Sequence, residues 1–193
     1  MFKPLISLLA ALTLTACDSG TPAKLNNGDS APSFTTSSLN ASNVKFPDDL
    51  RGKAVVIRFW ADWCRYCEDE MKAIERVWQR HKGEGLEVIA INAGQDKAAV
   101  AAFIKKIGVT YPALLDESAA ISKQYGVLAL PTTYFVGRDG RIRTKVLGEA
   151  DEATLSASHW NCSNEPALRF VRPRLWRQTL HAVYAGQDSE ILL

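Results

Sequence analysis

The sequence is poor in cysteine and histidine, with 4 and 3 residues respectively in a chain of 193. Four cysteines are too few to hold a small protein together by disulfides alone, and three histidines offer little material for a metal cluster. The chain also lacks an excess of either charge, because 23 Lys and Arg face 21 Asp and Glu. We therefore expect no nucleic-acid partner and no bound metal. With 47% hydrophobic residues, the composition fits an ordinary globular protein of one domain rather than two.

Long apolar runs are scarce, and the most prominent one lies between Lys3 and Asp18. It spans residues 4–14, which is too short to cross a membrane as a helix and fits the apolar core of a secretory signal. No other segment approaches the roughly 20 apolar residues that a membrane helix needs. We therefore predict a signal peptide over residues 1–16 and a mature protein outside the cytoplasm, where disulfides persist.

This apolar run ends in Leu14-Thr15-Ala16-Cys17, which resembles the bacterial lipoprotein box. The resemblance implies that Cys17 becomes a lipid-modified N-terminus, and a plain secretory signal that leaves Cys17 as a thiol is the alternative. Residues 17–32 are rich in Ser, Gly, Asn, Pro and Thr, as a flexible tether is. In lipoproteins an Asp after the Cys, here Asp18, often accompanies retention at the inner membrane. The expected location is therefore the cell envelope, on the periplasmic face of that membrane.

Beyond the tether, short β-branched runs alternate with amphipathic helical patterns. We expect strands over residues 33–36, 44–46, 54–60, 86–92, 111–115, 132–136 and 141–147. We expect helices over residues 64–82, 96–107 and 118–125. This alternation predicts an α/β sandwich, a mixed sheet with helices on both faces, built as one domain over residues 33–155. Residues 156–193 are expected to form a C-terminal extension of unknown role, in which Cys162 is a bystander.

The pair Cys64 and Cys67 stands where the predicted strand 54–60 passes into a helix. A Cys-x-x-Cys pair occurs in redox sites, in zinc sites and by coincidence. A zinc site needs two further ligands at short spacing, which are missing nearby, and covalent haem needs a His where Glu68 stands. Two cysteines three residues apart can close a small disulfide ring with little rearrangement. We therefore predict a redox-active Cys64–Cys67 disulfide.

The helix N-terminus gives the two cysteines different expected roles. The helix dipole and the unpaired N–H groups there favour a thiolate, and Arg65 adds a positive charge beside Cys64. We expect Cys64, at the tip of the helix, to be the exposed nucleophile. We expect Cys67, one turn further in, to be buried and to act as the resolving thiol.

The segment Phe59-Trp60-Ala61-Asp62-Trp63-Cys64-Arg65-Tyr66-Cys67 resembles the active-site motif of the thioredoxin superfamily. Over residues 29–151 the chain is similar to the TlpA/ResA-type extracytoplasmic thiol-disulfide reductases, and this likeness includes residues 85–92 and 130–136. The resemblance implies a thioredoxin-like three-layer sandwich. It also implies that Pro131 is cis and packs against the cysteine pair, and that Leu130 offers backbone groups to the substrate.

Two charged positions relate differently to this family. Glu70 matches a glutamate of the ResA-type branch, which implies that it is the acid–base group acting on Cys67. A solvated carboxylate in the first helical turn is the alternative. Thioredoxins place a buried Asp where this chain has Arg58. Because a buried, unpaired Arg is very costly, we expect Arg58 to find a carboxylate partner or to reach the surface.

A substrate-binding surface is expected around the cysteines. It consists of Trp63, Arg65 and Tyr66 together with Leu130 and Pro131. Trp60 belongs either to this surface or to the core.

The family resemblance implies a membrane-tethered enzyme that reduces disulfides in exported proteins, apocytochrome c among them. It implies a membrane electron donor of the DsbD/CcdA type, no cofactor and a monomer. One alternative is a peroxiredoxin-like thiol peroxidase, against which Ala61 counts, because a Thr is expected at that position. The other is a non-catalytic copper(I) chaperone that uses Cys64 and Cys67 as soft ligands.

Overall fold

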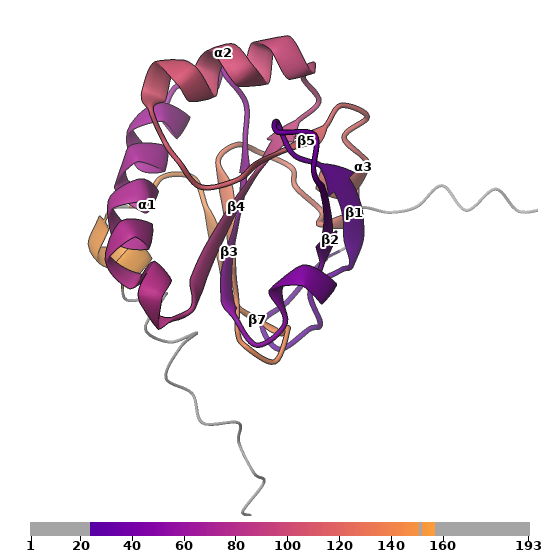
Figure 1. Ribbon diagram of the computed structural model, residues 1–193. Helices are drawn as coiled ribbons and strands as arrows, with labels where there is room; N and C mark the ends of the chain where they lie inside the picture. The colour runs from indigo at the N-terminus through magenta and orange to yellow at the C-terminus, as the bar shows by residue number, and fades with distance from the viewer. Residues whose placement is uncertain (1–23, 151, 157–193) are drawn as a thin grey trace, which may run out of the picture.

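The computed structural model describes residues 24–150 and 152–156, and within them a five-stranded mixed sheet forms the centre of the molecule (Figure 1). The strand order is β5-β4-β3-β6-β7. The strands of this sheet are β3 (Ala54–Trp60), β4 (Leu86–Ala93), β5 (Ala113–Asp116), β6 (Thr132–Val136) and β7 (Ile142–Leu147). Strand β4 is parallel to both of its neighbours, β3 and β5, whereas β6 is antiparallel to both β3 and β7. The mixed sheet predicted from the sequence is confirmed.

Helices and a hairpin cover the two faces of this sheet. The helices are α1 (Cys67–His81), α2 (Lys97–Ile107) and α3 (Ala120–Gln124), with short 3-10 turns η1 (Asp48–Leu50) and η2 (Lys82–Glu84). The hairpin consists of β1 (Phe34–Ser37) and β2 (Asn43–Phe46), which pair antiparallel. The thioredoxin-like sandwich with helices on both faces is therefore confirmed.

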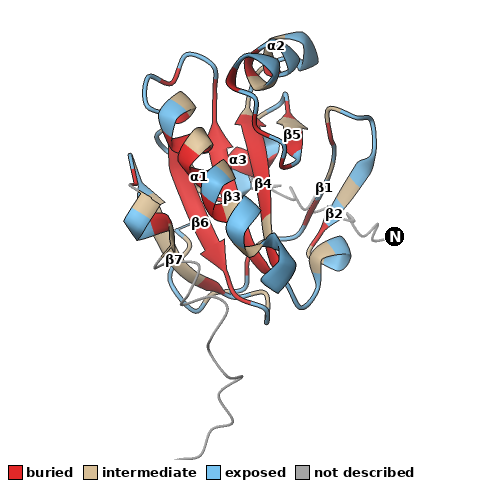
Figure 2. Cartoon of the chain, turned by 60° about the vertical axis from the view of Figure 1, so that its left-hand side comes forward, coloured by how far each residue is buried: buried red, intermediate tan, exposed pale blue. Residues whose placement is uncertain are grey.

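Strand β3 is central because its sequence is apolar on both sides. All seven of its residues are buried (Figure 2). Since side chains alternate along a strand, Val56, Arg58 and Trp60 point to one face and Val55, Ile57 and Phe59 to the other. The first face packs against α1 and α2, and the second packs against α3 and the β1–β2 hairpin. A buried arginine on a central strand thus lies under helix α1.

Helix α1 begins later than the sequence predicted. Its first residue is Cys67, so Cys64 precedes the helix instead of opening it. The backbone N–H of Cys67 donates to the carbonyl of Cys64 at 3.1 Å, which makes a turn ahead of the helix. The end agrees with the prediction, because the helix passes through η2 into Gly85, which has a φ of +91°.

The domain also begins earlier than residue 33. The N–H of Gly28 donates to the carbonyl of Ile142 at 2.7 Å, and that of Ala31 donates to the carbonyl of Gly140 at 3.0 Å. Ala31 is buried. These bonds fix residues 28–31 on the β6–β7 turn, so the predicted tether over 17–32 is wrong at its C-terminal end.

The remaining boundaries assigned from the sequence fall largely outside the described residues. The signal peptide, Cys17, and nearly all of the extension, with Cys162, lie there. Residues 152–156 are helical, and Leu155 among them packs against α1. No helix within the described part of the chain is long and apolar enough to cross a membrane.

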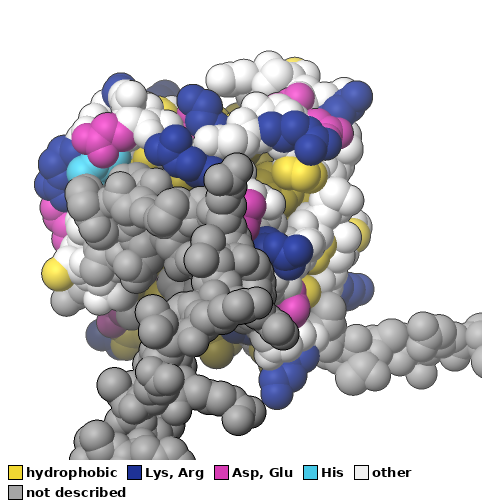
Figure 3. Space-filling model, turned by 90° about the horizontal axis from the view of Figure 1, so that it is seen from below, with side chains coloured by type: hydrophobic (Ala, Val, Ile, Leu, Met, Phe, Trp, Pro, Cys, Tyr) yellow, Lys and Arg dark blue, Asp and Glu magenta, His cyan; other side chains and the backbone are white. Residues whose placement is uncertain are grey.

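The pole of the molecule seen from below carries side chains of both charges. Figure 3 shows Lys and Arg interspersed with Asp and Glu over the atoms that undescribed residues do not cover. Oppositely charged side chains also pair elsewhere in the described structure, such as Arg51 with Asp48 at 2.6 Å and Lys53 with Glu87 at 3.9 Å. This face therefore has no field of a single sign, as the balanced composition indicated.

Candidate active site

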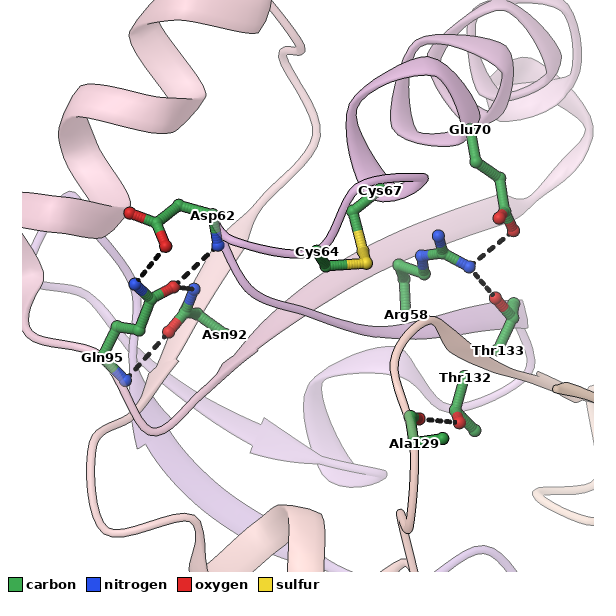
Figure 4. The surroundings of a disulfide bond; sticks show 10 residues. All are labelled: Arg58, Asp62, Cys64, Cys67, Glu70, Asn92, Gln95, Ala129, Thr132 and Thr133. Atoms are coloured by element: carbon green, nitrogen blue, oxygen red, sulfur yellow. Dashed lines mark hydrogen bonds and ion pairs between the residues drawn. A yellow bond between two sulfur atoms is a disulfide. The ribbon is translucent and has the colours of Figure 1, made fainter. Parts of the chain in front are cut away.

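The two cysteines lie where β3 ends and α1 begins. Cys64 and Cys67 are joined by a disulfide, with 5.4 Å between their Cα atoms (Figure 4). Cys67 is fully buried, as the sequence predicted, and Cys64 is 7% exposed. In this disulfide form, therefore, Cys64 is not the exposed residue that the sequence predicted.

Cys64 nevertheless opens onto a groove. The groove has a volume of about 410 Å³, and it is lined by Asp62, Cys64, Arg65, Glu68, Ala99, Ala102, Phe103 and Lys106. Its walls are the loop before α1, the first turn of α1 and one side of α2. An approaching molecule would therefore reach the disulfide from the side of Cys64 rather than that of Cys67.

The groove carries a surface ion-pair cluster. Glu68 lies 2.9 Å from the Nζ of Lys72 and 2.7 Å from the Nζ of Lys106. Hydrogen bonds from these two lysines lower the pKa of Glu68 to about 2. The cluster connects the first turn of α1 to α2 and so joins two walls of the groove.

Arg58 and Glu70 form a buried ion pair beneath the disulfide. The Nη1 of Arg58 donates to Oε1 of Glu70 at 2.5 Å and to Oγ1 of Thr133 at 2.7 Å (Figure 4). The side chains of Arg58 and Glu70 are 0% and 2% exposed. Arg58 thus has the carboxylate partner that the sequence required, and Glu70 is not the solvated carboxylate of the alternative.

Burial acts on both members of this pair. Desolvation raises the pKa of Glu70, and the positive charge of Arg58 opposes this rise. Desolvation also lowers the pKa of Arg58, although a guanidinium keeps its proton in proteins. Glu70 is therefore the member of the pair that can take up a proton.

Two exposed aromatic side chains flank the disulfide. Trp63 is 70% exposed and Tyr66 is 46% exposed. The guanidinium carbon of Arg65 lies 5.7 Å from the centre of the Tyr66 ring. Trp60, by contrast, is fully buried and stacks on Phe103 of α2, so it belongs to the core.

Leu130 and Pro131 precede β6 and lie at the same end of the strands as the cysteines, which follow β3. The peptide bond between them is cis, as the family resemblance implied. Phe59 pairs with Thr132 across β3 and β6, so Pro131 lies level with the end of β3. Pro131 is buried, and Leu130 packs partly buried against both hydrophobic clusters.

One hydrogen-bond network at the site is marked by no motif in the sequence. The side chain of Gln95 accepts from the N–H of Asp62 at 2.8 Å and donates to the Asp62 carboxylate at 2.6 Å. The amide of Asn92 donates to Gln95 at 2.9 Å and accepts from its backbone N–H at 3.1 Å. These bonds fix the loop before Cys64 to the end of β4. The buried Asn92, the last residue of an apolar run, was the available signal.

The described residues contain no group of three or more His, Cys, Asp and Glu side chains that could hold a metal ion. The site consists instead of a disulfide, a buried ion pair and an aromatic rim. This arrangement can accept and give electrons by exchange of sulfur–sulfur bonds.

Comparison with known proteins agrees with this chemistry. The model of the AhpC/TSA family matches residues 27–145. The thiol-disulfide oxidoreductase ResA of Bacillus thuringiensis subsp. konkukian is 33% identical over 132 residues, which are 68% of this chain and 76% of that protein. ResA of Bacillus subtilis is 31% identical over 153 residues, 78% of this chain and 85% of that protein.

A solved structure agrees as well. A solution structure from Bacteroides thetaiotaomicron, provisionally named a protein disulfide isomerase, is 31% identical with a TM-score of 0.67, and the match covers 73% of this chain and 92% of that one. The family model spans more than half of the chain, and these relatives are named for disulfide chemistry. The chain therefore belongs to the AhpC/TSA family, as a thiol-disulfide oxidoreductase of the thioredoxin fold.

Proposed function

We propose that this protein reduces disulfides in exported proteins through the dithiol form of Cys64 and Cys67. The observation that carries the proposal is the asymmetry of the disulfide. Cys67 is fully buried, whereas Cys64 lines an open groove beside the exposed Trp63 and Tyr66. A client can thus form a bond to one sulfur while the other stays protected, which two-step exchange requires.

The reaction proceeds by two displacements. The Cys64 thiolate attacks one sulfur of the client disulfide, which forms a mixed disulfide and releases the other client sulfur as a thiolate. The Cys67 thiolate then attacks Sγ of Cys64, and the second client sulfur leaves. Two electrons pass to the client, and the enzyme ends with the Cys64–Cys67 disulfide that the structure holds.

Glu70 is the acid–base group of this proposal. It stands three residues after Cys67 on α1, and residues so spaced share one face of a helix. Because burial raises its pKa, Glu70 can accept the proton that Cys67 must lose before the second displacement.

The client binds on the surface around the disulfide. Trp63 and Tyr66 offer apolar area and Arg65 offers a charge. The backbone of Leu130, which precedes the cis-proline Pro131, can pair with an extended client segment. Apocytochrome c, which has its own cysteine pair, is one client of this kind.

The location and the electron supply rest on the sequence. The apolar run over residues 4–14 and the Leu14-Thr15-Ala16-Cys17 segment support a lipid anchor at Cys17 in the periplasmic face of the inner membrane. The dithiol must be restored after each cycle, and a membrane dithiol donor of the DsbD/CcdA type would supply those two electrons. The protein would act as a monomer and without a cofactor.

Reduction of insulin by dithiothreitol tests this function. We expect the protein to accelerate it, the Cys64→Ser variant to be inactive, and Cys67→Ser to accumulate a mixed disulfide. Cys162→Ser, a matched loss of one thiol, should behave as the parent. A reduction potential nearer to the value of about −270 mV for thioredoxin than to about −120 mV for DsbA would support the reducing direction.

Two other outcomes of this assay would contradict the proposal. No acceleration over dithiothreitol alone, with tight copper(I) binding, would identify a chaperone. No acceleration, with rapid consumption of hydrogen peroxide, would identify a peroxidase.

A further inference from the structure

Arg58 brings a complete positive charge into the core directly under the active site. Its side chain is fully buried, and it comes from β3, two residues before that strand ends at Trp60 and six residues before Cys64. Its Nη1 donates to Glu70 and to Thr133. Its Nε and Nη2 have no hydrogen-bond partner among the described residues. A buried guanidinium with free donors is rare, because each unmade hydrogen bond costs free energy.

The free donors of Arg58 lie on the same inner side of α1 as Cys67. Cys67 and Glu70 stand three residues apart on α1, and both are buried on its inner side. In Figure 4 the guanidinium of Arg58 lies between the disulfide and the Glu70 carboxylate. The residue that pairs with Glu70 is thus also placed on the side of the disulfide.

The charges around this pocket are few. Glu70 on α1 is the ion-pair partner, Tyr111 from the segment before β5 faces Arg58, and Glu149 after β7 faces Glu70. Burial holds the pKa of Tyr111 well above its usual range, so this phenol stays neutral. With the disulfide closed, the described residues place one fixed positive charge and one negative charge in the buried pocket.

We propose that Arg58 is the shared counter-ion of Glu70 and Cys67: it pairs with the Glu70 carboxylate in the disulfide form, and it stabilises the Cys67 thiolate once that thiol has given its proton to Glu70. This role deepens the proposed function, since it rests on Glu70 as the proton acceptor. Arg58 acts through these two residues and is a positioning residue.

The proposal follows from charge balance in a buried site. Reduction of the disulfide by the dithiol donor, which supplies the two electrons and two protons of that step, leaves Cys67 as a thiol beside the Arg58–Glu70 pair. Transfer of its proton to an oxygen of Glu70 moves the negative charge to the sulfur without adding a charge to the pocket. The free Nε–H and Nη2–H groups then donate to the thiolate, so the buried anion is paired before and after the transfer.

A purely structural ion pair would behave differently. If Arg58 only held α1 on the sheet, removal of either partner would loosen the same packing and would change the reactivity of Cys67 in the same direction. A shared counter-ion predicts opposite directions. Loss of Arg58 removes the charge that favours the thiolate, whereas loss of Glu70 removes the charge that competes with it.

The rate of alkylation of Cys67 by iodoacetamide, followed against pH, measures this difference. The background carries Cys17→Ser, Cys64→Ala and Cys162→Ser, so that Cys67 is the single thiol among the four cysteines. In this background Arg58→Met should slow alkylation at pH 7 by about ten-fold and Glu70→Gln should speed it by about ten-fold, the change that one pKa unit makes in the thiolate fraction.

Two variants serve as controls. Arg58→Lys keeps the charge and should restore most of the rate that Arg58→Met loses. Thr133→Val removes a hydrogen bond from Nη1 without a change of charge, and it should leave the rate as in the parent. Shifts of the same sign in Arg58→Met and Glu70→Gln, or an unchanged rate in Arg58→Met, would overturn the proposal.

A double variant keeps the test valid if the single variants fold poorly. Arg58→Met combined with Glu70→Leu replaces the ion pair by apolar side chains of similar size, which buried pairs commonly tolerate. In this variant Cys67 should be alkylated as slowly as in Arg58→Met. A rate equal to that of the parent would overturn the proposal.

The readout needs neither client nor electron donor. If the parent protein does not reduce insulin, the proposed function is wrong, and the alkylation rates of the variants can still be compared. If the parent reduces insulin but Arg58→Met is alkylated at the parent's rate, the counter-ion role is wrong and the reductase function stands.

Discussion

The two faces of the central sheet differ in how their polar groups are satisfied. On the face covered by α3 and the β1–β2 hairpin, tyrosines lie among aromatic rings and each donates to a carbonyl: Tyr134 to Tyr125 at 2.5 Å and Tyr125 to Pro32 at 2.7 Å. On the face covered by α1 and α2, donors of Arg58, Trp60 and Trp78 lack partners within the described structure. Figure 2 shows that the central strands between these two faces are buried.

This difference separates the structural from the chemical side of the molecule. Rings packed edge to face, such as Phe59 on Tyr134 with 6.1 Å between centroids, stabilise the fold and offer nothing that reacts. Unpaired buried donors reduce stability, and they persist where a ligand or an intermediate uses them. The α1 face holds the disulfide and the ion pair. Its buried donors without hydrogen-bond partners therefore accord with a role in thiol–disulfide exchange.

The largest effect is expected on the α1 face. Glu70→Leu alone leaves the Arg58 guanidinium buried and unpaired, and we expect a loss of about 3–5 kcal/mol in the free energy of unfolding, because this group cannot release its proton. Arg58→Met alone should cost less, because Glu70 can become neutral. Urea unfolding of both variants measures the difference.

The double variant sharpens this comparison. Arg58→Met with Glu70→Leu should recover the stability of the parent or exceed it by about 1–4 kcal/mol, as apolar replacement of buried ion pairs often does. Its turnover should stay low. A double variant as unstable as Glu70→Leu would mean that the pair stabilises the fold, and the contrast between the faces would disappear.

The next largest loss of stability is expected on the face covered by α3 and the β1–β2 hairpin. Tyr134→Phe removes the donor to the buried carbonyl of Tyr125 and should cost about 1–3 kcal/mol, with unchanged insulin reduction. Tyr111→Phe is the matched change on the other face, where the hydroxyl donates to the carbonyl of Met71 at 3.0 Å. Similar losses in the two variants would show that the faces differ in their unpaired groups and not in the strength of their bonds. A fall in turnover in Tyr134→Phe would break the comparison.

The fold was predictable because local patterns and packing agree along most of the chain. The ranges of β3 and β6 match the predicted strands residue for residue, since both are buried β-branched or aromatic runs bounded by turns. Helix α2 starts after Asp96, which accepts from the N–H of Ala99, and ends at Gly108 with a φ of +72°, so its cap residues were readable in advance.

The misplaced boundaries have a physical cause. The helical pattern predicts a start of α1 at Cys64, yet the disulfide and the turn to Cys67 keep that residue outside the helix. The composition of residues 17–32 predicts a tether, although Gly28 and Ala31 form hydrogen bonds to the β6–β7 turn. Composition does not report such long-range pairing.

The site was predictable in its residues and less so in their relations. The spacing of the two cysteines predicts the role of Cys67, the resemblance to the ResA-type branch implies that of Glu70, and the cost of a buried charge predicts a partner for Arg58. That Arg58 and Glu70 are each other's partner depends on how α1 lies on β3, which no local pattern contains. The Gln95 network joins two loops in the same way, and no motif marks it.

A smaller effect is expected at Gln95, which connects the two loops of the site. Gln95→Ala removes its side-chain bonds to Asp62 and Asn92 and frees the loop before Cys64. We expect turnover of insulin to fall by about ten-fold, because misplacement of a reacting group is costly, with a much smaller change in unfolding. Gln79→Ala, which removes an amide on the exposed side of α1, is the control. Equal turnover in the two variants would show that the loop is held by other contacts.

The smallest change in stability should come from the surface ion-pair cluster at the groove. Lys106 and Lys72 lower the pKa of Glu68 to about 2 from its ordinary 4.5, so the folded protein binds this proton less readily than the unfolded chain. The stabilisation is therefore present above pH 4.5 and is lost as the pH falls toward 2. Glu68→Gln should flatten the acid arm of the stability curve slightly, and salt should reduce the difference between variant and parent.

The buried Glu70 should change the free energy of unfolding with pH in the opposite direction to Glu68 and over a higher pH range. Its pKa is raised by burial, so the folded protein binds this proton more readily, and its contribution to stability falls as the pH rises above the ordinary value. Urea unfolding of the parent, Glu68→Gln and Glu70→Gln from pH 3 to 8 separates the two carboxylates. Removal of Glu68 should change the curve below pH 4.5 and removal of Glu70 above it. Curves that change over the same range would show that exposed and buried carboxylates on α1 experience similar surroundings.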